Sequence, residues 1–454
     1  MRKPPELMKK CSLLLLLFFV PISLLIAQDF SNKGKDFWLA YGYHVRYVTG
    51  VPQNQQEMIL YFTSDQNATV TVEIPSIGYA IQYSVIANQV TPSAPIPKVG
   101  AQDARLTSVG LSNKGIHVTS DKPIVAYAHI YNASVSGASL LFPTNTLGKE
   151  YYSVNYTQRS NEGASNSFFF VVATEDDTQI EITPSASNLN GLAVGIPSAP
   201  ISLKKGEVYH VLGTLSGATG SDLTGSKIRS ISASGAPCKP IAVFSGSGKI
   251  SIGGSGNGSA DNLFAQAFPS KAWGLKYLTV PTGSQPNNFY RVCVKDPTTN
   301  VKLNGVDLPK SSLQNGFYYE FKNAGGVTSP KPNVIEADQP ILVSQYMTTQ
   351  GVEGNPNYSV ALNSPGGDPE MIYLSPVEQT INNINLYSAA QFRILSSYIN
   401  VVIRKEGVTS FKIDGVTPVL GSFNPHPEDP NYSYATLQVS NGSHSISSDS
   451  GFNA

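Results

Sequence analysis

Three stretches of the sequence share one pattern, a polar residue, then Pro, then an apolar run. They read DKPIVAY at 121–127, CKPIAVF at 238–244 and DQPILVS at 338–344. Runs of Ile, Val and aromatic residues favour β-strands. Proline at the first position of a strand costs the hydrogen-bond ladder least, because its missing N–H is not needed there. The recurrence therefore predicts a chain built from repeated β units.

Each Pro-led run is followed by an apolar residue and Pro, in LFP at 141–143, AFP at 267–269 and LSP at 374–376. After the first two, a Gly and a Tyr stand at equal distances from the Pro, as Gly148 with Tyr151 and Gly274 with Tyr277. These equal spacings support the repeat.

Two further phrases recur. A strand, a polar or acidic turn and a second strand occur at 60–72 and 169–182, and we interpret them as hairpins. A glycine turn before an aromatic strand occurs at 203–209, at 313–319 and more loosely at 439–444. Asn304-Gly305 and Asp414-Gly415 are further turn signals, because tight hairpins need positive φ.

The composition agrees with an all-β chain. The 454 residues include 39 Gly and 31 Pro, which would break long helices, and only 14% are charged against roughly 25% in ordinary domains. With 41% hydrophobic residues the chain has enough apolar surface to fold, which argues against disorder. The formal net charge of 0 gives no electrostatic footprint for nucleic acid.

We expect tandem antiparallel β-sandwich-like units, with a pseudo-symmetric closed arrangement of the repeats as the alternative. The predicted segments are, in order, a signal peptide (1–27), a leader (28–54), three full β units (55–160, 161–284 and 285–388) and an incomplete fourth unit (389–454). The fourth has no copy of the Pro-led strand. Because a missing strand exposes an unpaired sheet edge, we expect a longer protein that continues past Ala454.

The N-terminus predicts export. A basic start precedes the apolar run SLLLLLFFVPISLLIA at 12–27, which ends at a small residue, as in secretory signal peptides. An uncleaved membrane anchor is the alternative, but Pro21 and Ala27 favour cleavage. Cys11 lies outside any lipobox, since Met8-Lys9-Lys10 precede it. The protein is thus expected outside the cell or at its surface, with no membrane span after signal removal.

Removal of the signal peptide leaves Cys238 and Cys293. Two cysteines cannot form a disulfide scaffold, so the apolar core must carry the fold. They could pair in an oxidising compartment, but the alternation at 289–294 reads equally well as a strand with a buried thiol.

The sequence contains no pattern that indicates a catalytic carboxylate pair. Glu175-Asp176-Asp177 lies in a predicted turn, where Asp side chains bond backbone N–H groups. Three further carboxylates, Asp368, Glu370 and Glu378, follow a Gly-Gly loop, but nothing in the sequence fixes their partners, and a glycosidase needs two that face each other.

Other chemistries lack their patterns too. The histidines never occur at ligand spacing; they are His44, His117, His129, His210, His426 and His444. The run SGSG at 245–248 has no nucleophile-elbow pattern, and the Gly-rich run at 253–259 has no Lys-Ser/Thr ending. We therefore predict no catalytic residue, no metal site and no cofactor, and we assign no ligand-contact residue. Tyr pairs at 151–152 and 318–319 could contact a partner, although Tyr is also a good strand former.

Four phrases together resemble a known family. They are GKDFW at 34–38, ATEDDT at 173–178, DLTGS at 222–226 and KPIAVFSG at 239–246, and they resemble the IgGFc-binding protein N-terminal domain family over most of residues 34–350. In animals this family looks like the amino-terminal part of a mucus protein that binds the Fc part of immunoglobulin G. Similar domains occur in exported surface proteins of Bacteroidetes-type bacteria. The chain lacks the cysteine-rich von Willebrand modules of the animal pattern, and the resemblance implies a class of protein and no contact residue.

Three functional hypotheses follow. The first is an exported, non-enzymatic binding or adhesion module, with glycoprotein, mucin or IgG Fc as candidate partners. The second is a carbohydrate-active enzyme or its accessory domain, which would need two inward carboxylates in a cleft lined by Trp or Tyr. Trp38 and Trp273 both lie in repeated or family-like phrases that suggest packing instead. The third is a structural spacer, which a surface with no concave or aromatic site would favour.

Overall fold

A computed structural model of the chain describes residues 32–50, 52–232, 235–253, 259–283, 287–323, 330–350, 368–389, 394, 396–419 and 421–454. They belong to one compact unit, Ser31–Ala454. The expected signal peptide at 1–27 and most of the Gly-rich run at 253–259 lie outside the described residues. The predicted all-β fold is confirmed, because the named strands pair antiparallel throughout and every described helix is a short 3-10 turn. No described helix is long and apolar enough to cross a membrane.

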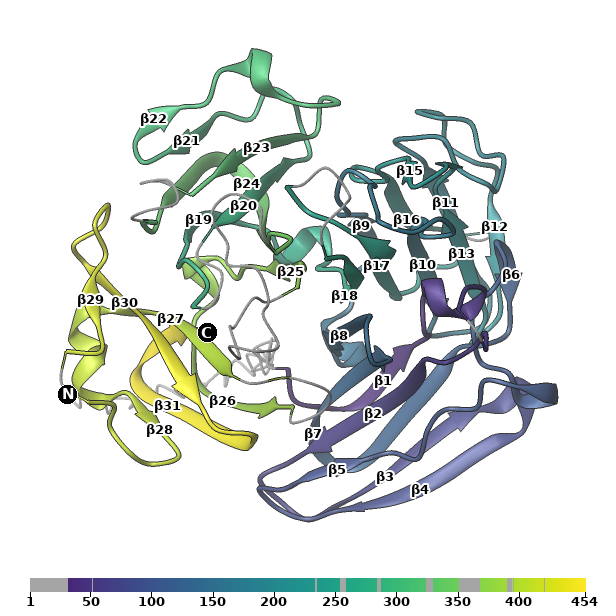
Figure 1. Cartoon of the computed structure of the whole chain (residues 1–454), viewed down its shortest axis with the longest axis horizontal. Coiled ribbons are helices and arrows are strands. Elements are labelled where there is room, and N and C mark those ends of the chain that lie inside the picture. Colours follow the sequence, from purple (N-terminus) through teal and green to yellow (C-terminus); the bar gives the residue numbers. More distant parts are fainter. Residues whose placement is uncertain are drawn as a thin grey trace, which may run out of the picture. The chain divides into compact units, whose positions relative to one another are not determined.

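The first group of strands centres on a long strand, β7 (Ile116–Tyr131) (Figure 1). The strand order is β4 (Tyr79–Val85), β3 (Ala68–Ile74), β7, β2 (Glu57–Thr63) and β5 (Val90–Pro92), and β1 (Gly34–Leu39) and β8 (Ser136–Leu140) also pair with β7.

The second group consists of two sheets and a small hairpin. One sheet has the order β18 (Asp261–Gln266), β17 (Ile241–Ile250), β10 (Ser167–Ala173), β13 (Val208–Leu212) and β6 (Gly110–Ser112). The other has the order β12 (Ile201–Leu203), β11 (Thr178–Thr183), β16 (Lys227–Ile231) and β9 (Glu150–Tyr152), and the hairpin joins β14 (Leu215–Ser216) to β15 (Thr219–Gly220).

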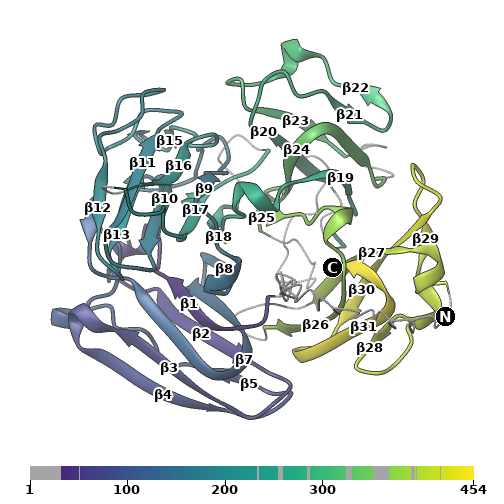
Figure 2. The same ribbon diagram turned by 180° about the vertical axis from the view of Figure 1, so that it is seen from behind.

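The third group again centres on one long strand, β24 (Val334–Met347), and Figure 2 shows it from behind. Its order is β22 (Val306–Asp307), β21 (Val301–Leu303), β24, β20 (Asn288–Val294) and β23 (Tyr318–Lys322), and β19 (Gly274–Leu278) and β25 (Glu370–Tyr373) also pair with β24. The fourth sheet has the order β26 (Ile381–Ser388), β31 (Gly442–Asn453), β27 (Ser397–Arg404), β30 (Tyr432–Val439) and β29 (Asn424–Pro425), with β28 (Lys412–Ile413) on β31.

The 3-10 turns connect these strands. They are η1 (Val45–Tyr47), η2 (Pro75–Ile77), η3 (Gly100–Gln102), η4 (Thr144–Thr146), η5 (Ser270–Ala272), η6 (Lys310–Ser312), η7 (Val377–Gln379) and η8 (Lys405–Ser410). Three of them, η4, η5 and η7, directly follow the repeated apolar-Pro segments.

The Pro-led strands differ from the prediction in one respect. Pro240 directly precedes β17, as expected, but Pro123 and Pro340 lie inside β7 and β24. In both long strands the residues before and after the Pro pair with different neighbours. In β7 the part before Pro123 pairs with β3 and the part after it with β2, and in β24 the corresponding partners are β21 and β20. The Pro therefore marks the point where the strand exchanges one neighbour for another, while β1 and β19 pair on both sides of it.

The same pairing corrects the predicted hairpins at 60–72 and 169–182. β2 and β3 pair with the two ends of β7, and not with each other, and β10 and β11 lie in different sheets. The first turn thus carries the chain from one side of β7 to the other, and the second carries it from one sheet to another. Period-two alternation cannot distinguish this crossing from a hairpin, because a strand alternates whichever neighbour it pairs with.

The predicted glycine turns do have the conformation that hairpins need. Asn304 and Gly305 have φ of 51° and 79°, and Asp414 and Gly415 have φ of 52° and 78°. Positive φ at both central residues suits a tight turn between twisted strands. Cys238 and Cys293 are both unpaired, and Cys293 is buried in β20.

A close Gly–Pro contact recurs three times and closes each repeat. Gly34, Gly148 and Gly274 pair with the Ile that follows the Pro of each Pro-led run, namely Ile124, Ile241 and Ile341. A Cβ on these glycines would lie 2.2, 2.4 and 2.2 Å from the Cβ atoms of Pro143, Pro269 and Pro376. Real Cβ atoms do not come that close, so only Gly fits.

The tyrosines three residues after Gly148 and Gly274 strengthen this contact. The hydroxyl of Tyr151 accepts from the Gly148 N–H at 2.8 Å and donates to the Ile241 carbonyl at 2.8 Å. The hydroxyl of Tyr277 does the same with Gly274 at 3.1 Å and Ile341 at 2.6 Å. The equal Gly-to-Tyr spacing in the sequence therefore corresponds to the same buried pair of hydrogen bonds in both repeats.

Apolar cores run across neighbouring groups of strands. Phe168, Phe170 and Phe244 of the second group belong to the same buried cluster as Phe37 and Phe62 of the first. Further clusters join the second group to the third and the third to the fourth. Between the first and fourth groups, the rings of Tyr61 and Tyr387 lie 4.9 Å apart, and Thr63 and Ser443 share a hydrogen bond of 3.1 Å. The division into units at 55–160, 161–284, 285–388 and 389–454 remains a prediction.

Substitution at a closing glycine should destabilise the fold. Gly274→Ala would overpack the contact with Pro376, which typically costs about 1–3 kcal/mol in the free energy of unfolding. Gly163→Ala is the matched control, because a Cβ there meets only the Gly217 carbonyl oxygen, at 3.9 Å. Denaturant unfolding should show a clear loss for the first variant and almost none for the second; equal behaviour of the two would contradict the proposed role of the contact.

Candidate functional site

A half-open pocket lies where the third and fourth groups of strands meet. Its volume is about 550 Å3, and its walls come from β24, β25 and the end of β19 on one side and from β26, β27 and β31 on the other. The floor is apolar, because Leu278, Val280 and Val402 belong to one buried cluster with Val334 and Tyr432. The pocket is therefore part of the packing between two sheets.

The side chains that line the pocket are uncharged and include both apolar and polar groups. No Asp, Glu, Lys, Arg or His side chain is among the described residues that line it, whereas three tyrosines are, Tyr373, Tyr387 and Tyr398. Tyr398 is the most open of these, with 40% of its surface exposed. Gly283 allows this ring to lie close to the opposite wall, because a Cβ at Gly283 would lie 2.9 Å from ring atoms of Tyr398.

Two amide side chains hold the walls together. The carbonyl of Val280 accepts a hydrogen bond from Gln345 Nε2 at 2.8 Å and another from Asn400 Nδ2 at 3.2 Å. Asn400 Oδ1 in turn accepts from the hydroxyl of Thr436 at 2.9 Å. Because these amides are occupied within the protein, they fix the shape of the pocket.

One lining group lacks a partner among the described residues. The hydroxyl of Ser388, at the end of β26, is buried and makes no hydrogen bond there. A buried hydroxyl without a partner costs free energy, so such a group is suited to a ligand that brings one. With aromatic rings, a free hydroxyl and no charge, the pocket can take a neutral ligand that has both apolar and hydroxyl-bearing faces.

Two of the three carboxylates that follow the Gly-Gly loop lie near each other, outside the pocket. Glu370 begins β25 and Asp368 lies two residues before it, while the neighbouring strand β18 begins at Asp261, whose carboxyl group is close enough to be repelled by both. Burial raises the pKa of all three, for Glu370 to about 8. Glu378 lies apart from them and accepts a hydrogen bond from the Leu275 N–H at 3.2 Å.

These carboxylates make stability depend on pH. Glu370 has a higher pKa in the folded protein than its ordinary value of 4.5, so the folded state binds its proton more tightly than the unfolded chain does. Stability should therefore fall as the pH rises from about 4.5 to about 8.

Glu370→Gln should flatten this pH dependence, because the variant keeps a neutral side chain at every pH. Melting temperatures across the window from about 4.5 to about 8 would measure it. Asp296→Asn is the control, since hydrogen bonds from Thr298 lower the pKa of Asp296 and keep it ionised throughout. A Glu370→Gln variant with the same pH slope as the wild type would show that this carboxyl does not carry the effect.

The acidic turn at Glu175-Asp176-Asp177 performs the role of a turn. Asp177 has a φ of 55°, Asp176 Oδ1 accepts from the Lys205 N–H at 3.0 Å, and Glu175 pairs with Lys239 at 2.9 Å. All of these bonds fasten the turn to neighbouring loops. The three carboxylates face no common cleft in the described structure.

The other candidates serve packing. Ser245 and Ser247 are buried in β17, and Gly246 between them is required because a Cβ would lie 1.8 Å from the Leu263 carbonyl oxygen. Trp38 and Trp273 are buried, as are the tyrosines at 151–152 and 318–319.

The described residues contain no group of three or more His, Cys, Asp or Glu side chains that could hold a metal ion. His117, for example, stacks on Trp38 and bonds Asp36 at 2.8 Å.

A buried arginine that the sequence analysis did not single out joins the second group of strands to the third. Arg291 of β20 is fully buried, and its guanidinium donates to Asp222 Oδ2 at 2.7 Å and to Glu320 Oε2 at 2.8 Å. Although burial alone would lower the pKa of this group, the carboxylates hold it raised. The rings of Tyr156 and Tyr318 lie 4.4 and 4.2 Å from its central carbon. The sequence signal for this buried ion pair was Arg291 itself, a charged residue within the otherwise apolar stretch 289–294.

Loss of this arginine should be costly. Arg291→Gln leaves two carboxylates without their buried partner, which typically costs about 3–5 kcal/mol. Arg229→Gln removes an arginine from a pair of the same length, 2.7 Å to Glu181, but 46% of the Arg229 side chain is exposed, so the loss should stay below about 1 kcal/mol. Denaturant unfolding would compare them, and similar losses would contradict the joining role of Arg291.

Comparisons with known proteins give one result. The sequence model of a family described as IgGFc binding protein matches residues 137–454, which is more than half of the chain and includes every residue that lines the pocket. No curated protein and no solved structure matches the chain.

Proposed function

The chain belongs to the IgGFc binding protein family, and we propose that it works as an exported binding or adhesion module without catalytic activity. The family description, which is that of a binding protein, supports this role. The apolar run at 12–27, which is typical of a signal peptide, supports a place outside the cell or at its surface.

The observation that carries the proposal is the uncharged, tyrosine-lined pocket inside the matched region. Glycoproteins, mucins and IgG Fc, our candidate partners, all carry sugar chains. Sugar rings have apolar faces that pack on aromatic rings and hydroxyls that hydrogen-bond to polar groups such as the Ser388 hydroxyl. We therefore propose that the pocket binds a neutral sugar residue of a glycoprotein.

The two rival functions have less support. A glycosidase needs two Asp or Glu side chains across a cleft, and none is among the described residues that line the pocket. A pure spacer needs no concave aromatic site, but the described residues form one. Glycan hydrolysis by the purified protein would favour the enzyme, and the absence of binding would favour the spacer.

Binding can be measured by biolayer interferometry of the purified protein against IgG Fc, mucin and a glycan array. We expect affinity for at least one of them, and loss of that affinity when the ligand is enzymatically deglycosylated. Equal binding to intact and deglycosylated ligand would contradict sugar recognition while leaving protein binding in place.

Tyr398→Ala tests whether the pocket is responsible. Removal of a stacking ring should weaken binding about tenfold, equivalent to roughly 1.4 kcal/mol, without a change in fold. Val419→Ala is the control, because Val419 is the most exposed large apolar residue of the fourth group and does not line the pocket. If Tyr398→Ala binds like the wild type, the ligand site lies elsewhere.

A further inference from the structure

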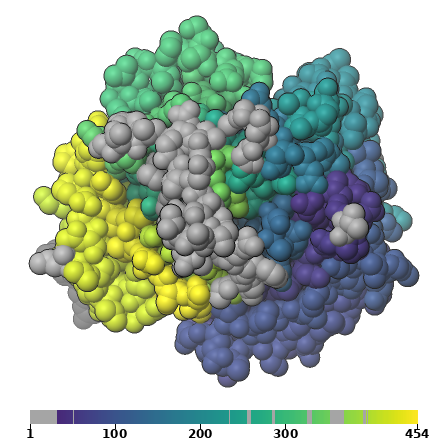
Figure 3. Space-filling model, in the orientation of Figure 1, coloured from purple at the N-terminus to yellow at the C-terminus, as the bar shows by residue number. Residues whose placement is uncertain are grey.

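Basic side chains gather where the second and third groups of strands meet. Figure 3 shows the blue-green surface of the second group beside the green surface of the third, and an apolar cluster that includes Tyr152, Trp273 and Phe317 joins the two groups. Five cations come together at this junction, and we call them the basic patch. They are Lys149, Lys227, Arg229, Lys271 and Lys295.

The ladder between β9 and β16 places the first two cations. Glu150 pairs with Arg229, and Tyr152 pairs with Lys227, so these four side chains share one face of the sheet. Lys227 Nζ lies 3.0 Å from Glu150 Oε2, and Arg229 Nε lies 2.7 Å from Glu181 Oε1. Each of these two carboxylates therefore engages one of the five cations.

The short turn η5 brings Lys271 to the same place. The hydroxyl of Ser270 donates to Glu150 Oε1 at 3.0 Å, and Lys271 follows it directly in the chain. Burial and the like charge of Lys149 together lower the pKa of Lys271. Two lysines that repel each other in this way indicate positive charge that the protein itself does not neutralise.

Lys295, directly after β20, extends the patch onto the third group. Its Nζ lies 5.8 Å from the centre of the Trp273 ring, as Lys227 Nζ lies 5.7 Å from the centre of the Tyr152 ring, and the two rings are 5.4 Å apart. Although burial alone would raise the pKa of Glu150, the hydrogen bond with Lys227 and the charge of Lys295 are among the effects that lower it. The cations of the two groups thus form one continuous patch.

Three of the five cations are left without a counter-charge. Among the residues that the structure describes, Lys149, Lys271 and Lys295 form no ion pair, and all three are exposed. Asp296 is next to Lys295 in the chain, but its carboxylate accepts from the N–H and the hydroxyl of Thr298, both at 2.8 Å, and so faces its own loop. Exposed charge that is not neutralised within the protein attracts a partner of opposite charge.

The layout of the patch suits a long polymer with negative charges. Its cations come from four separate segments in two groups of strands, and none of them lines the pocket. Tyr152 and Trp273 are only 8% and 5% exposed, so these rings support the lysines and offer no face on which a nucleic-acid base could stack.

The positive charge is a local feature of an acidic chain. Residues 1–27 hold four of the 31 Lys and Arg residues and one of the 31 Asp and Glu residues. Residues 28–454 therefore keep 27 basic and 30 acidic side chains. A polyanion would be repelled by the chain as a whole, so its binding depends on this patch.

We infer that the basic patch binds an acidic sugar chain, one that bears sulfate or carboxylate groups. The choice of a sugar chain rests on the proposed role outside the cell, whereas the patch does not depend on the neutral-sugar pocket. Lysine ammonium groups make charge-assisted hydrogen bonds with anionic oxygens and tolerate many arrangements of them. The protein then has one site for a neutral sugar residue and a second site for an acidic polymer.

Immobilised heparin, a sulfated sugar chain, is the probe for biolayer interferometry of the purified protein. The combined variant Lys149→Gln, Lys271→Gln and Lys295→Gln should raise the Kd for heparin at least about tenfold. Added salt should weaken binding of the wild type, because it screens exposed charges. The three side chains are exposed and form no ion pair, so the variant should keep the melting temperature of the wild type.

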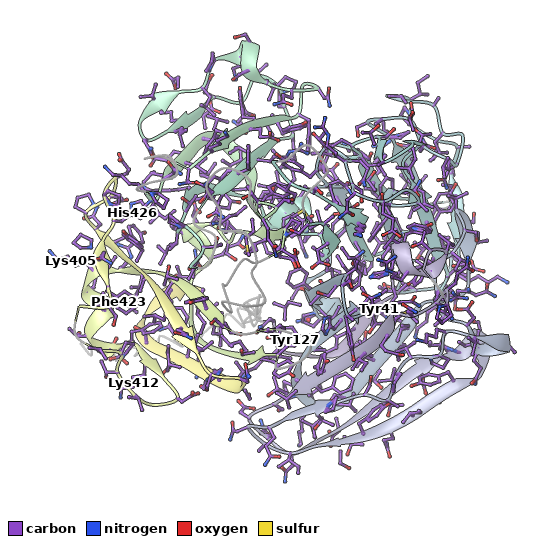
Figure 4. All side chains as sticks on the ribbon, in the orientation of Figure 1. Tyr41, Tyr127, Lys405, Lys412, Phe423 and His426 are labelled. Carbon is purple, nitrogen blue, oxygen red and sulfur yellow. The ribbon has the colours of Figure 1, made fainter. Side chains whose placement is uncertain are left out.

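The matched control combines Lys122→Gln, Lys405→Gln and Lys412→Gln. It removes the same charge from exposed lysines of the first and fourth groups, the last two of which Figure 4 labels, and it should bind heparin like the wild type. A wild type that does not bind heparin, equal Kd values for the two triple variants, or equally tight binding of double-stranded DNA would overturn the inference. Binding of neutral sugars at the pocket is measured separately, so either proposal can fail alone.

Discussion

The contact between a glycine and a proline about 100 residues apart is the constraint on which the rest of the fold depends. Gly274 opens the third group of strands and Pro376 closes it, and the two touch so closely that no side chain fits between them. The same glycine pairs with Ile341, directly after the Pro that divides β24. This contact thus joins the start of a repeat, its end and the position in its longest strand where the pairing partner changes. Gly148 and Gly274, which begin the second and third repeats, follow Pro143 and Pro269 by five residues. These two Pro residues therefore also fix where the next repeat starts.

The candidate pocket follows from this arrangement. The third and fourth groups meet just after the end of β19 and in the middle of β27, where the Val280 carbonyl accepts from amides of both groups. The backbone and the amide side chains of Gln345 and Asn400 therefore set the position of the walls that carry the tyrosines. Figure 4 labels Tyr127 of β7, which faces Tyr387 at a ring distance of 6.5 Å, so the strand that contributes Tyr387 to the pocket also contacts the first group. A site supported from several sheets is suited to recognition with little rearrangement.

The sequence predicted the all-β class, the repeat and the turn conformations, because those depend on local residue preferences and on spacing. Three features of the structure could not be predicted from the sequence. The alternation in β2 and β3 did not reveal that they pair with different ends of β7. The apolar run around Arg291 gave no sign of Asp222 and Glu320, which lie 69 and 29 residues away. The pocket forms between β24 and β27, which are far apart in the sequence. The residue pattern of a strand does not indicate which distant strand it will meet. Asp368 and Glu370 could be named as candidates, but only the fold showed that their neighbour is Asp261.

We propose that the protein recognises a neutral sugar residue of a glycoprotein through the pocket between its third and fourth groups of strands. Hydrogen exchange of the purified protein with and without a bound glycoprotein tests it most directly, because it reports where contact occurs. We expect slower exchange over 278–283 and 396–402, which supply both walls. Binding that slows exchange only in other segments would contradict it.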